Sequence, residues 1–527
     1  MHYIHTIRLC VLAIHLLPLF GKAQTELVTI SLDPRKQFQQ IDGFGASDAW
    51  RCQFVGNYWP KEKKEAIADM LFSKELDTWG NPKGIGLSIW RFYIGAGTAE
   101  QGEASDIINE WRRADSFLDS AGKYDWSKQQ GQQWFLNQAK KYGVERFLAF
   151  SISAPVFWTL NGKGYNTLSK SGINLQSDKF EAYTDFLIAV LEHFKTQNIH
   201  FDYLSPINEP QWDWETPKQE GTPATNEDIS KLAQLLNKKM NAISLPTKIG
   251  IPEAADLRYL YQPKDRPNRE DQINAFFNPG SNLSVRGQEN VMHTVLGHSY
   301  FTTWPVDSLI SIRQQLNEKL TKHNIDYWQS EFCILENTED IGSGKKRDLG
   351  INTALYVARV IHADLTLANA KSWQWWTALT NADFKDGLIY LDTGDKEDMY
   401  NLKSLKKDGE FHDSKLLWAF GNFSRFVRPG MVRVHAKLTS SKSLQQQYED
   451  FMISAYTNPS LSEVVVVAIN YSESAKKLEF ENQHILLEKM YITSKNENLE
   501  YHQIQNKNIE LPAKSITTFI GTYTDEE

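Results

Sequence analysis

Two glutamates stand out because each closes an apolar stretch that predicts a buried strand. Glu209 lies in "YLSPINEPQWDW" (203–214), and Glu331 lies in "DYWQSEF" (326–332). A charged carboxyl at such a place is costly unless a partner or a reaction requires it. Two carboxyls that flank one bond can act as a proton donor and as a nucleophile or base. Cleavage of a glycosidic bond requires such a pair.

Side chains next to Glu209 extend this interpretation. Asn208 precedes it, and its carboxamide can hydrogen-bond a sugar hydroxyl as charge develops in the transition state. Trp212 and Trp214 follow on the same segment, and indole rings pack against the apolar faces of sugars. Asn-Glu-Pro alone occurs by chance in about one chain of this length in twenty, and acids at strand ends also cap helices. The chemistry therefore depends on whether the fold brings Glu209 and Glu331 together.

Eight short apolar runs alternate with longer amphipathic segments in the first four fifths of the chain. The runs are 41–47, 84–95, 146–153, 201–209, 248–254, 294–301, 326–332 and 372–379. Segments between them repeat apolar residues at helical spacing, as in 179–197. This alternation predicts an α/β fold, a (β/α)8 TIM barrel over residues 41–424. Glu209 then ends the fourth strand and Glu331 the seventh, at the face where such barrels carry their reactive groups.

From residue 425 the hydrophobic period changes to two. Runs such as "DFMISAYTN" and "EVVVVAINYS" alternate apolar and polar residues and are bounded by Asn, Ser, Pro and Gly, which predicts antiparallel strands. Residues 425–527 are therefore expected to form an appended antiparallel β-sandwich. The alternating segment 24–40 predicts one more strand, which we expect to join this sandwich.

The N-terminal segment 1–23 has the pattern of a secretory signal peptide. It carries Arg8, an apolar run over 9–20 and a small residue at Ala23, the expected cleavage site. The run is too short to span a membrane. No later stretch is apolar enough to cross a bilayer, so we expect no membrane insertion. The expected location of the mature protein is secreted or periplasmic.

Charge and composition exclude several partner classes. The formal charge is −8, and it becomes −10 without residues 1–23, so the surface repels nucleic acid and anionic membranes. The 13 histidines are scattered, with no HxH or HExxH pattern, so we expect no metal and no cofactor. Cys52 and Cys333 are expected to be buried thiols. The oligomeric state stays open.

Longer motifs point to a family. The segments "IDGFGASDAW" (41–50), "SPINEPQWDW" (205–214), "YWQSEF" (327–332) and "LPAKSITTFIG" (511–521) together resemble glycoside hydrolase family 30, whose retaining enzymes have a (β/α)8 barrel and a side β-sandwich. Three further segments most resemble its endo-β-1,6-galactanase branch: "SIWRFYIGAG" (88–97), "WRRADSF" (111–117) and "QEG" (219–221). The likeness spans essentially all of the chain after residue 23. It implies a polysaccharide substrate, the β-1,6-galactan side chains of arabinogalactan.

Carried over position by position, the resemblance makes Glu209 the acid/base and Glu331 the nucleophile. Arg91, at the end of the second strand, would pair with the nucleophile and hold it ionised. Tyr300, at the end of the sixth strand, resembles the family tyrosine that donates to the nucleophile. His298 points the same way two residues earlier, although a core histidine with satisfied partners is an equally good interpretation. Retention of configuration predicts carboxyls about 5 to 5.5 Å apart.

Six more side chains complete the predicted sugar site. Trp158 and Trp376 match strand-end aromatics that wall the sugar in the family, with plain core packing as the alternative. Asp48 either binds a hydroxyl of the innermost sugar or caps a helix. Because loops carry substrate choice, the candidates for the leaving-group side lie on the long loop after the fourth strand: Trp212, Trp214 and Glu220.

Two alternatives to galactan cleavage stay open. The first is the same fold and mechanism on another β-glycan, as in an endo-β-1,6-glucanase, a xylanase or an exo-glycosidase, because galactose and glucose differ by one axial hydroxyl. The second is a non-catalytic carbohydrate-binding protein, which would lack one of the strand-end carboxylates. Both glutamates are present, which favours an enzyme.

Overall fold

A closed barrel of eight parallel strands forms the body of the protein. The computed structural model describes residues 26–168, 172–481, 485–504 and 509–524; the expected signal peptide, residues 1–23, lies outside them. The barrel order is β11-β2-β3-β4-β5-β6-β7-β8. Its strands are β2 (Gly43–Ser47), β3 (Ile89–Tyr93), β4 (Arg146–Phe150), β5 (Tyr203–Ser205), β6 (Lys248–Ala254), β7 (Val291–His298), β8 (Asp326–Glu331) and β11 (Ser372–Trp375). The predicted (β/α)8 barrel is confirmed.

Each barrel strand overlaps one of the eight apolar runs, but several strands are shorter than their run. The run 201–209 yields only β5, because Pro206 follows Ser205 and has no backbone N–H to extend the ladder. The run 84–95 begins as a loop in which Gly86 has φ +57°, a left-handed conformation that glycine adopts readily. The residues beyond the strand ends form the loops at the barrel mouth.

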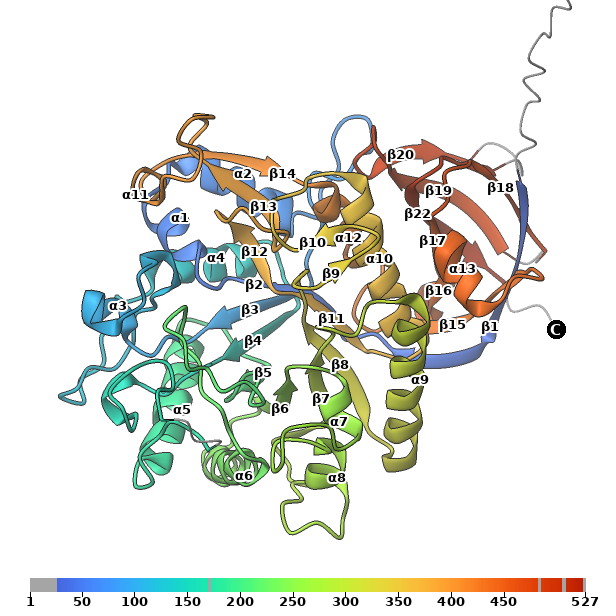
Figure 1. Ribbon diagram of the computed structural model, residues 1–527. Coiled ribbons are helices and arrows are strands. Elements are labelled where there is room, and N and C mark those ends of the chain that lie inside the picture. The colour runs from blue at the N-terminus through green and yellow to red at the C-terminus, as the bar shows by residue number, and fades with distance from the viewer. Residues whose placement is uncertain (1–25, 169–171, 482–484, 505–508, 525–527) are drawn as a thin grey trace, which may run out of the picture.

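Helices surround the barrel (Figure 1). They are α1 (Cys52–Tyr58), α2 (Lys61–Phe72), α3 (Thr98–Gln101), α4 (Gln130–Lys141), α5 (Phe180–Thr196), α6 (Asn226–Ala242), α7 (Arg258–Tyr261), α8 (Gln272–Phe277), α9 (Val306–His323), α10 (Ile351–Thr366), α11 (Leu402–Leu405) and α12 (Lys415–Ser424), with 3-10 turns at Gly102–Ser105, Glu110–Arg112 and Val156–Trp158. Helix α5 matches the predicted segment 179–197. Among the described helices, none combines the length and apolar character needed to cross a bilayer.

The last predicted barrel run, 372–379, divides into two strands. β11 ends at Trp375, and β12 (Thr377–Thr380) leaves the barrel to pair with β13 (Gly387–Asp392), which pairs in turn with β14 (Glu410–Asp413). A two-stranded ribbon, β9 (Asn337–Thr338) and β10 (Gly342–Ser343), lies between β8 and α10. Trp376 therefore lies at the break between barrel and side sheet.

A second domain consists of a nine-stranded, mostly antiparallel sheet, ordered β20-β19-β22-β17-β16-β15-β1-β18-β21. Phe480 of β18 contacts Phe519 of β22, with ring centroids 6.0 Å apart, although four strands separate β18 from β22 within the sheet. The sheet therefore folds over on an apolar core, which agrees with the predicted β-sandwich. Its elements are β1 (Glu26–Gln40), β15 (Val432–Thr439), α13 (Leu444–Asp450), β16 (Phe451–Asn458), a 3-10 turn (Pro459–Leu461), β17 (Glu463–Asn470), β18 (Lys476–Phe480), β19 (Ile485–Thr493), β20 (Glu500–Gln503), β21 (Ile509–Leu511) and β22 (Ser515–Tyr523).

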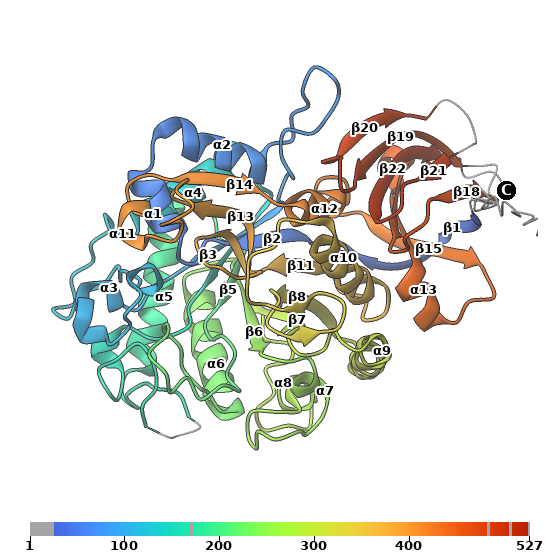
Figure 2. The same ribbon diagram turned by 45° about the horizontal axis from the view of Figure 1, so that its top comes forward.

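The two domains share a packed junction. Strand β1, drawn in blue beside the orange and red strands (Figure 2), pairs antiparallel with β15 and parallel with β18. The outer face of the sheet packs on barrel helices α10 and α12, where Asn422 donates to the Tyr491 carbonyl at 3.0 Å and accepts from Thr518 Oγ1 at 2.6 Å. Cys52 and Cys333 lie apart as buried, unpaired thiols, as expected.

Candidate active site

Glu209 lies just beyond β5 at the barrel mouth and is 7% exposed. Its backbone φ is +45°, a left-handed conformation that costs a non-glycine residue about 1 kcal/mol. Three hydrogen bonds hold this backbone: the Glu209 N–H donates to the Glu253 carbonyl (2.9 Å), and the Glu209 carbonyl accepts from the Trp212 N–H (3.1 Å) and Trp214 Nε1 (3.2 Å). The loop therefore fixes the direction of the Glu209 side chain.

Glu331 ends β8, and two donors contact its carboxylate. Arg91 Nη1 donates to Oε2, and the Tyr300 hydroxyl donates to Oε1 at 3.1 Å. Arg91 is fully buried on β3, and its Nη2 donates to Asn208 Oδ1 at 3.1 Å. Both contacts leave Glu331 as an acceptor, the role of an ionised carboxylate. Arg91, Asn208 and Tyr300 therefore all lie where the sequence predicted a site.

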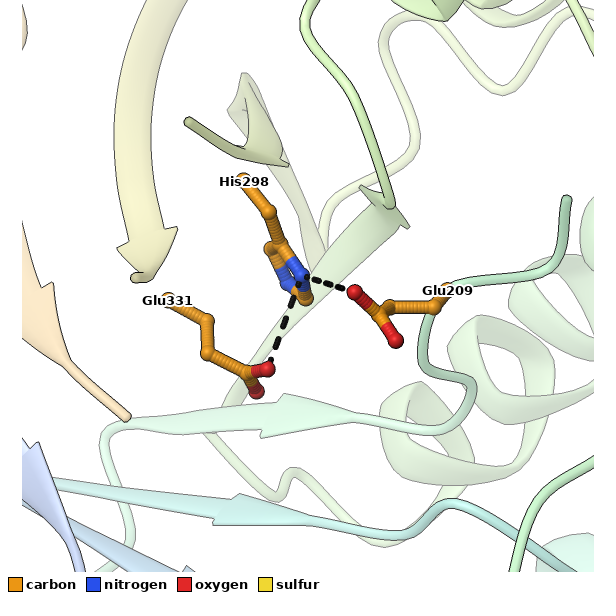
Figure 3. A group of neighbouring side chains, drawn as sticks. All are labelled: Glu209, His298 and Glu331. Carbon is orange, nitrogen blue, oxygen red and sulfur yellow. Dashed lines mark hydrogen bonds and ion pairs between the residues drawn. The ribbon is translucent and has the colours of Figure 1, made fainter. Parts of the chain in front are cut away.

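The two glutamates face each other across His298 (Figure 3). One oxygen of Glu209, one oxygen of Glu331 and one ring nitrogen of His298 all lie within 4.8 Å of one another. Retaining glycosidases have carboxyls about 5 to 5.5 Å apart, whereas inverting enzymes separate them by about 6.5 to 9.5 Å. The separation in this protein falls on the retaining side.

His298 and Glu253 form the base of the site. His298 Nδ1 lies 3.1 Å from Glu209 Oε1 and 3.7 Å from Glu331 Oε1, and its Nε2 lies 3.0 Å from Glu253 Oε2. Burial alone lowers the pKa of His298, but Glu331, Glu209 and Glu253 outweigh it and raise that pKa to about 10. An imidazolium that donates from both nitrogens fits these contacts.

Glu253, on β6, was missed by sequence reasoning. Burial raises the pKa of Glu253, but Arg91 and His298 outweigh it and lower that pKa to about 2. Ser205 and Ser330 also donate to this carboxylate. A signal was available, since Glu253 is a third glutamate near the end of a predicted strand, 248–254. Its partners lie far away in the sequence, so nothing local revealed its role.

The charges of this cluster balance when Glu209 is protonated. Arg91 and His298 are cations, while Glu253 and Glu331 are acceptors for them. Burial, the largest cause, raises the pKa of Glu209 above its ordinary value, and the contact with His298 offsets this only in part. Glu209 is therefore suited to begin as an acid, and Glu331 to act as an anion.

Tryptophans surround the mouth, but only some of them approach the carboxylates. The backbone N–H of Trp376 donates to the backbone carbonyl of Phe332, the residue after Glu331, at 2.8 Å. Its ring meets Trp50 edge-on, with centroids 5.4 Å apart, so Trp376 lies on the nucleophile side. Trp50 was also missed, although it ends the motif 41–50. Trp158 instead packs edge-on against Phe186 of α5 at 6.4 Å, as the core-packing alternative describes.

The loop after β5 carries the other two predicted tryptophans. Trp212 is half-buried and meets Phe301 edge-on at 6.1 Å. Trp214 packs on Gly221, where a Cβ would come within 2.3 Å of the indole. Because Trp214 also donates to the Glu209 carbonyl, its contacts position the acid.

Asp48 and Glu220 require correction, since both are 0% exposed and leave no surface for a sugar. Asp48 Oδ1 accepts from the Tyr93 N–H at 2.9 Å, which ties the end of β2 to β3. Glu220 accepts from the Tyr93 hydroxyl, from the Ala96 N–H at 3.1 Å and from Thr98 Oγ1 at 2.5 Å. Burial raises the pKa of Asp48 to about 8 and that of Glu220 to about 7. Both residues hold loops together.

Glu209, His298 and Glu331 are also the group of described residues whose donor atoms lie close enough to hold a metal ion. The chemistry of the group does not suit a cation. His298 has a pKa near 10 and so keeps its protons, and the Arg91 guanidinium already occupies one face of Glu331. A ligand histidine must be neutral.

Comparison with known proteins identifies the family. A solved structure, a conserved exported protein from Bacteroides fragilis, is 41% identical, with a TM-score of 0.88 over 93% of this chain and 100% of that one. The endo-β-1,6-galactanase of Hypocrea rufa is 24% identical over 433 residues, 79% of this chain and 78% of the relative. Glucuronoxylanase XynC of Bacillus subtilis strain 168 is 24% identical over 361 residues, 66% and 68% of the two chains.

The family model of O-glycosyl hydrolase family 30 matches residues 27–390. This match covers more than half of the chain and includes every carboxylate of the site, from β2 to the end of β8. It agrees with the resemblance carried by the sequence motifs. The chain belongs to O-glycosyl hydrolase family 30.

Proposed function

We propose that this protein is a retaining endo-β-1,6-galactanase that hydrolyses the β-1,6-galactan side chains of arabinogalactan by double displacement. The observation that carries the proposal is the pair of carboxyls, Glu209 and Glu331, with oxygens within 4.8 Å. Burial raises the pKa of Glu209, and Glu331 is held by Arg91 and Tyr300. A binding protein needs no such asymmetry.

In the first step, Glu209 donates its proton to the glycosidic oxygen while a carboxylate oxygen of Glu331 attacks the anomeric carbon. The bond to the leaving sugar breaks, and a glycosyl ester on Glu331 forms. The His298 imidazolium, 3.1 Å from Glu209 Oε1, stabilises the carboxylate left behind. Asn208 is held by Arg91 at 3.1 Å, ready to contact a ring hydroxyl.

In the second step, Glu209 accepts a proton from water as the water oxygen attacks the anomeric carbon. The ester bond to Glu331 breaks, so the carboxylate is regenerated and the configuration is retained after two inversions. Glu209 ends the cycle protonated. The charge balance of the cluster is then the same as at the start.

The galactan assignment is supported by the similarity to the Hypocrea rufa galactanase and by the motifs 88–97, 111–117 and 219–221. The main alternative is that the same catalytic residues cleave another β-glycan. The similarity to a glucuronoxylanase makes a xylan one candidate substrate. Endo action is part of the proposal, with exo action as its alternative.

We also propose that the protein is exported, either secreted or periplasmic, after cleavage near Ala23. The support is the basic, apolar and small-residue pattern of residues 1–23. The 41% identical relative carries the description of an exported protein. Mass spectrometry of the mature N-terminus tests this proposal, and a chain that keeps residues 1–23 after expression in its host would contradict it.

The test of the function is hydrolysis of β-1,6-galactan, β-1,6-glucan and glucuronoxylan side by side. Product lengths follow from chromatography, and the anomeric configuration of fresh product follows from NMR. We expect galacto-oligosaccharides of several lengths with the β configuration, and none from Glu331→Gln. Activity on glucan or xylan alone would keep the mechanism and overturn the substrate. An α-configured first product would overturn retention.

A further inference from the structure

A cavity of about 400 Å³ lies at the junction of the two domains, away from the barrel mouth. Barrel helix α10 forms one wall, and β15, α13 and β16 of the sheet domain form the others; Figure 1 labels these four elements. Small-molecule sites have volumes of about 300 to 1,000 Å³. The cavity therefore has room for a ligand the size of one or two sugar rings.

The charged side chains that line this cavity are all positive. Its lining contains two cationic side chains, Arg433 and Lys437, two histidines whose pKa burial lowers, His362 and His435, and no aspartate or glutamate. This is unusual in a chain whose formal charge is −8. The lining therefore favours an anion.

Arg433 is the centre of this charge and is 6% exposed. Its Nε donates to Gln39 Oε1 at 2.9 Å and its Nη2 to Asn369 Oδ1 at 2.6 Å, both neutral amides. Among the described residues, no carboxylate lies within ion-pair distance of this guanidinium. Burial lowers the pKa of Arg433 to about 10. A buried cation without an anion costs free energy, and a bound anion would offset that cost.

Two polar atoms of the lining have no hydrogen-bond partner within the described part of the chain. They are His362 Nδ1 and Ser454 Oγ, on side chains from residues that are 5% and 2% exposed. Buried polar groups are nearly always paired with protein or ordered water. Burial lowers the pKa of His362 to about 3, so its ring is neutral and suits a hydroxyl. Both side chains belong to the lining that holds the cation.

Apolar side chains complete the lining. Phe38 is 38% exposed, and the Arg433 guanidinium stacks on its ring at 3.8 Å. Leu444, Phe451 and Met452 lie along the same cavity. A ligand with one carboxylate, several hydroxyls and an apolar ring face matches this combination, whereas an inorganic anion would use the charge alone.

We propose that the junction cavity is a second, non-catalytic binding site for a sugar acid, with the carboxylate on Arg433 and hydroxyls on Ser454 and His362. The choice of a sugar rests on the proposed function, whereas the choice of an anion rests on the lining alone. The ligand is a uronic acid, either free or as a residue of a glycan. Binding there requires none of the catalytic glutamates.

Isothermal titration of the full-length mature protein tests the proposal with five probes: glucuronate, methyl β-glucuronide, methyl β-galactoside, acetate and inorganic phosphate. We expect one site for a sugar acid with a Kd near or below about 1 mM, and at least tenfold weaker binding of the other three probes. Binding of glucuronate alone assigns the site to free acid, and binding of the glucuronide assigns it to a glycan residue. Absence of binding by both sugar acids, or equally tight galactoside, acetate or phosphate, would overturn the proposal.

Variants locate the binding. Arg433→Gln should weaken it at least tenfold, and Ser454→Ala should weaken it about threefold to tenfold. The second variant removes one small hydroxyl and no charge, so it keeps the test valid if Arg433→Gln fails to fold. Arg425→Gln is the matched control, because Arg425 is a partly buried guanidinium held by the backbone carbonyls of Ser73, Gly84, Lys74 and Glu75. Unchanged affinity in Ser454→Ala and in a folded Arg433→Gln would contradict the proposal. Because no step is catalytic, failure here leaves the hydrolase assignment untouched.

Discussion

Two buried arginines, one at the barrel mouth and one at the domain junction, are held in opposite ways. Arg91 contacts the carboxylates of Glu331 and Glu253, and they outweigh burial and raise its pKa. The Arg433 guanidinium donates to two neutral amides and stacks on Phe38, and burial lowers its pKa to about 10. At the mouth each buried cation therefore has a carboxylate partner, whereas at the junction Arg433 has none among the described residues.

The difference shows what a buried charge requires. At the mouth the chain supplies both signs, and the one proton left to move belongs to Glu209. At the junction it supplies one sign and a cavity. A buried charge that lacks a partner costs free energy, so the unpaired arginine at the junction is the one that a ligand from outside would stabilise.

The largest expected effect comes from removing the nucleophile. Glu331→Gln keeps the shape of the side chain but cannot form the glycosyl ester, so kcat should fall by about 10⁴-fold or more. Steady-state hydrolysis of the best polymer measures this. The exposed Glu500→Gln is the control and should retain full activity. Residual activity within about tenfold of wild type would show that Glu331 is not the nucleophile.

Removing the acid should cost less, and the cost should depend on the leaving group. Glu209→Gln should lose about 10²- to 10⁴-fold on galactan and much less on an aryl galactoside, whose leaving group departs without a proton. Because burial raises the pKa of Glu209, wild-type kcat/KM should fall with rising pH only well above the ordinary glutamate pKa of about 4.3. The variant should lose that alkaline limb. Equal losses on both substrates would argue against the acid role.

The free energy of unfolding of two arginine variants tests the difference between the two sites. Arg91→Met removes one of the two cations that Glu253 and Glu331 contact, the other being His298, and should lower the free energy of unfolding by about 3 to 5 kcal/mol. Arg433→Met removes donors only from two amide oxygens and should cost about 1 to 2 kcal/mol. Urea unfolding of both variants measures the difference. Equal costs would mean that pairing does not distinguish the two sites.

The last expected effect is seen only as a dependence of stability on pH and concerns Glu220, a buried acid with no cation in ion-pair distance among the described residues. Burial raises the pKa of Glu220 to about 7, so the folded state holds this proton more tightly than the unfolded state. Its stabilising effect is complete below about pH 4.3 and is lost as pH rises through about 7, by about 4 kcal/mol in total. Glu220→Gln should flatten this part of the profile of unfolding free energy against pH, with Glu500→Gln as control. A profile identical to wild type would refute the assignment.

Site residues at strand ends were easier to predict from the sequence than site residues in loops. Glu209, Tyr300 and Glu331 lie at the ends of predicted strands, and a barrel directs all such ends to one mouth. Arg91 lies in the middle of β3 and not at its end, yet its long side chain reaches Glu331. Asp48 and Glu220 belong to loops, where composition does not reveal burial, and both turned out to hold loops together. Glu253 was available by the strand-end argument and was overlooked because no neighbouring motif drew attention to it.

The sequence by itself determined the alternation of strands and helices, the change to period two after residue 425 and the two strand-end glutamates, because hydrophobic periodicity is a local property. Only the tertiary structure decided which charges meet. Arg91 and Glu331 are 240 positions apart, and His298 and Glu253 are 45 apart; closure of the barrel brings them into contact and excludes water from them. The junction cavity likewise exists only where α10 of the barrel meets β15 and β16 of the sheet, since burial is a property of the packed domains and not of either segment.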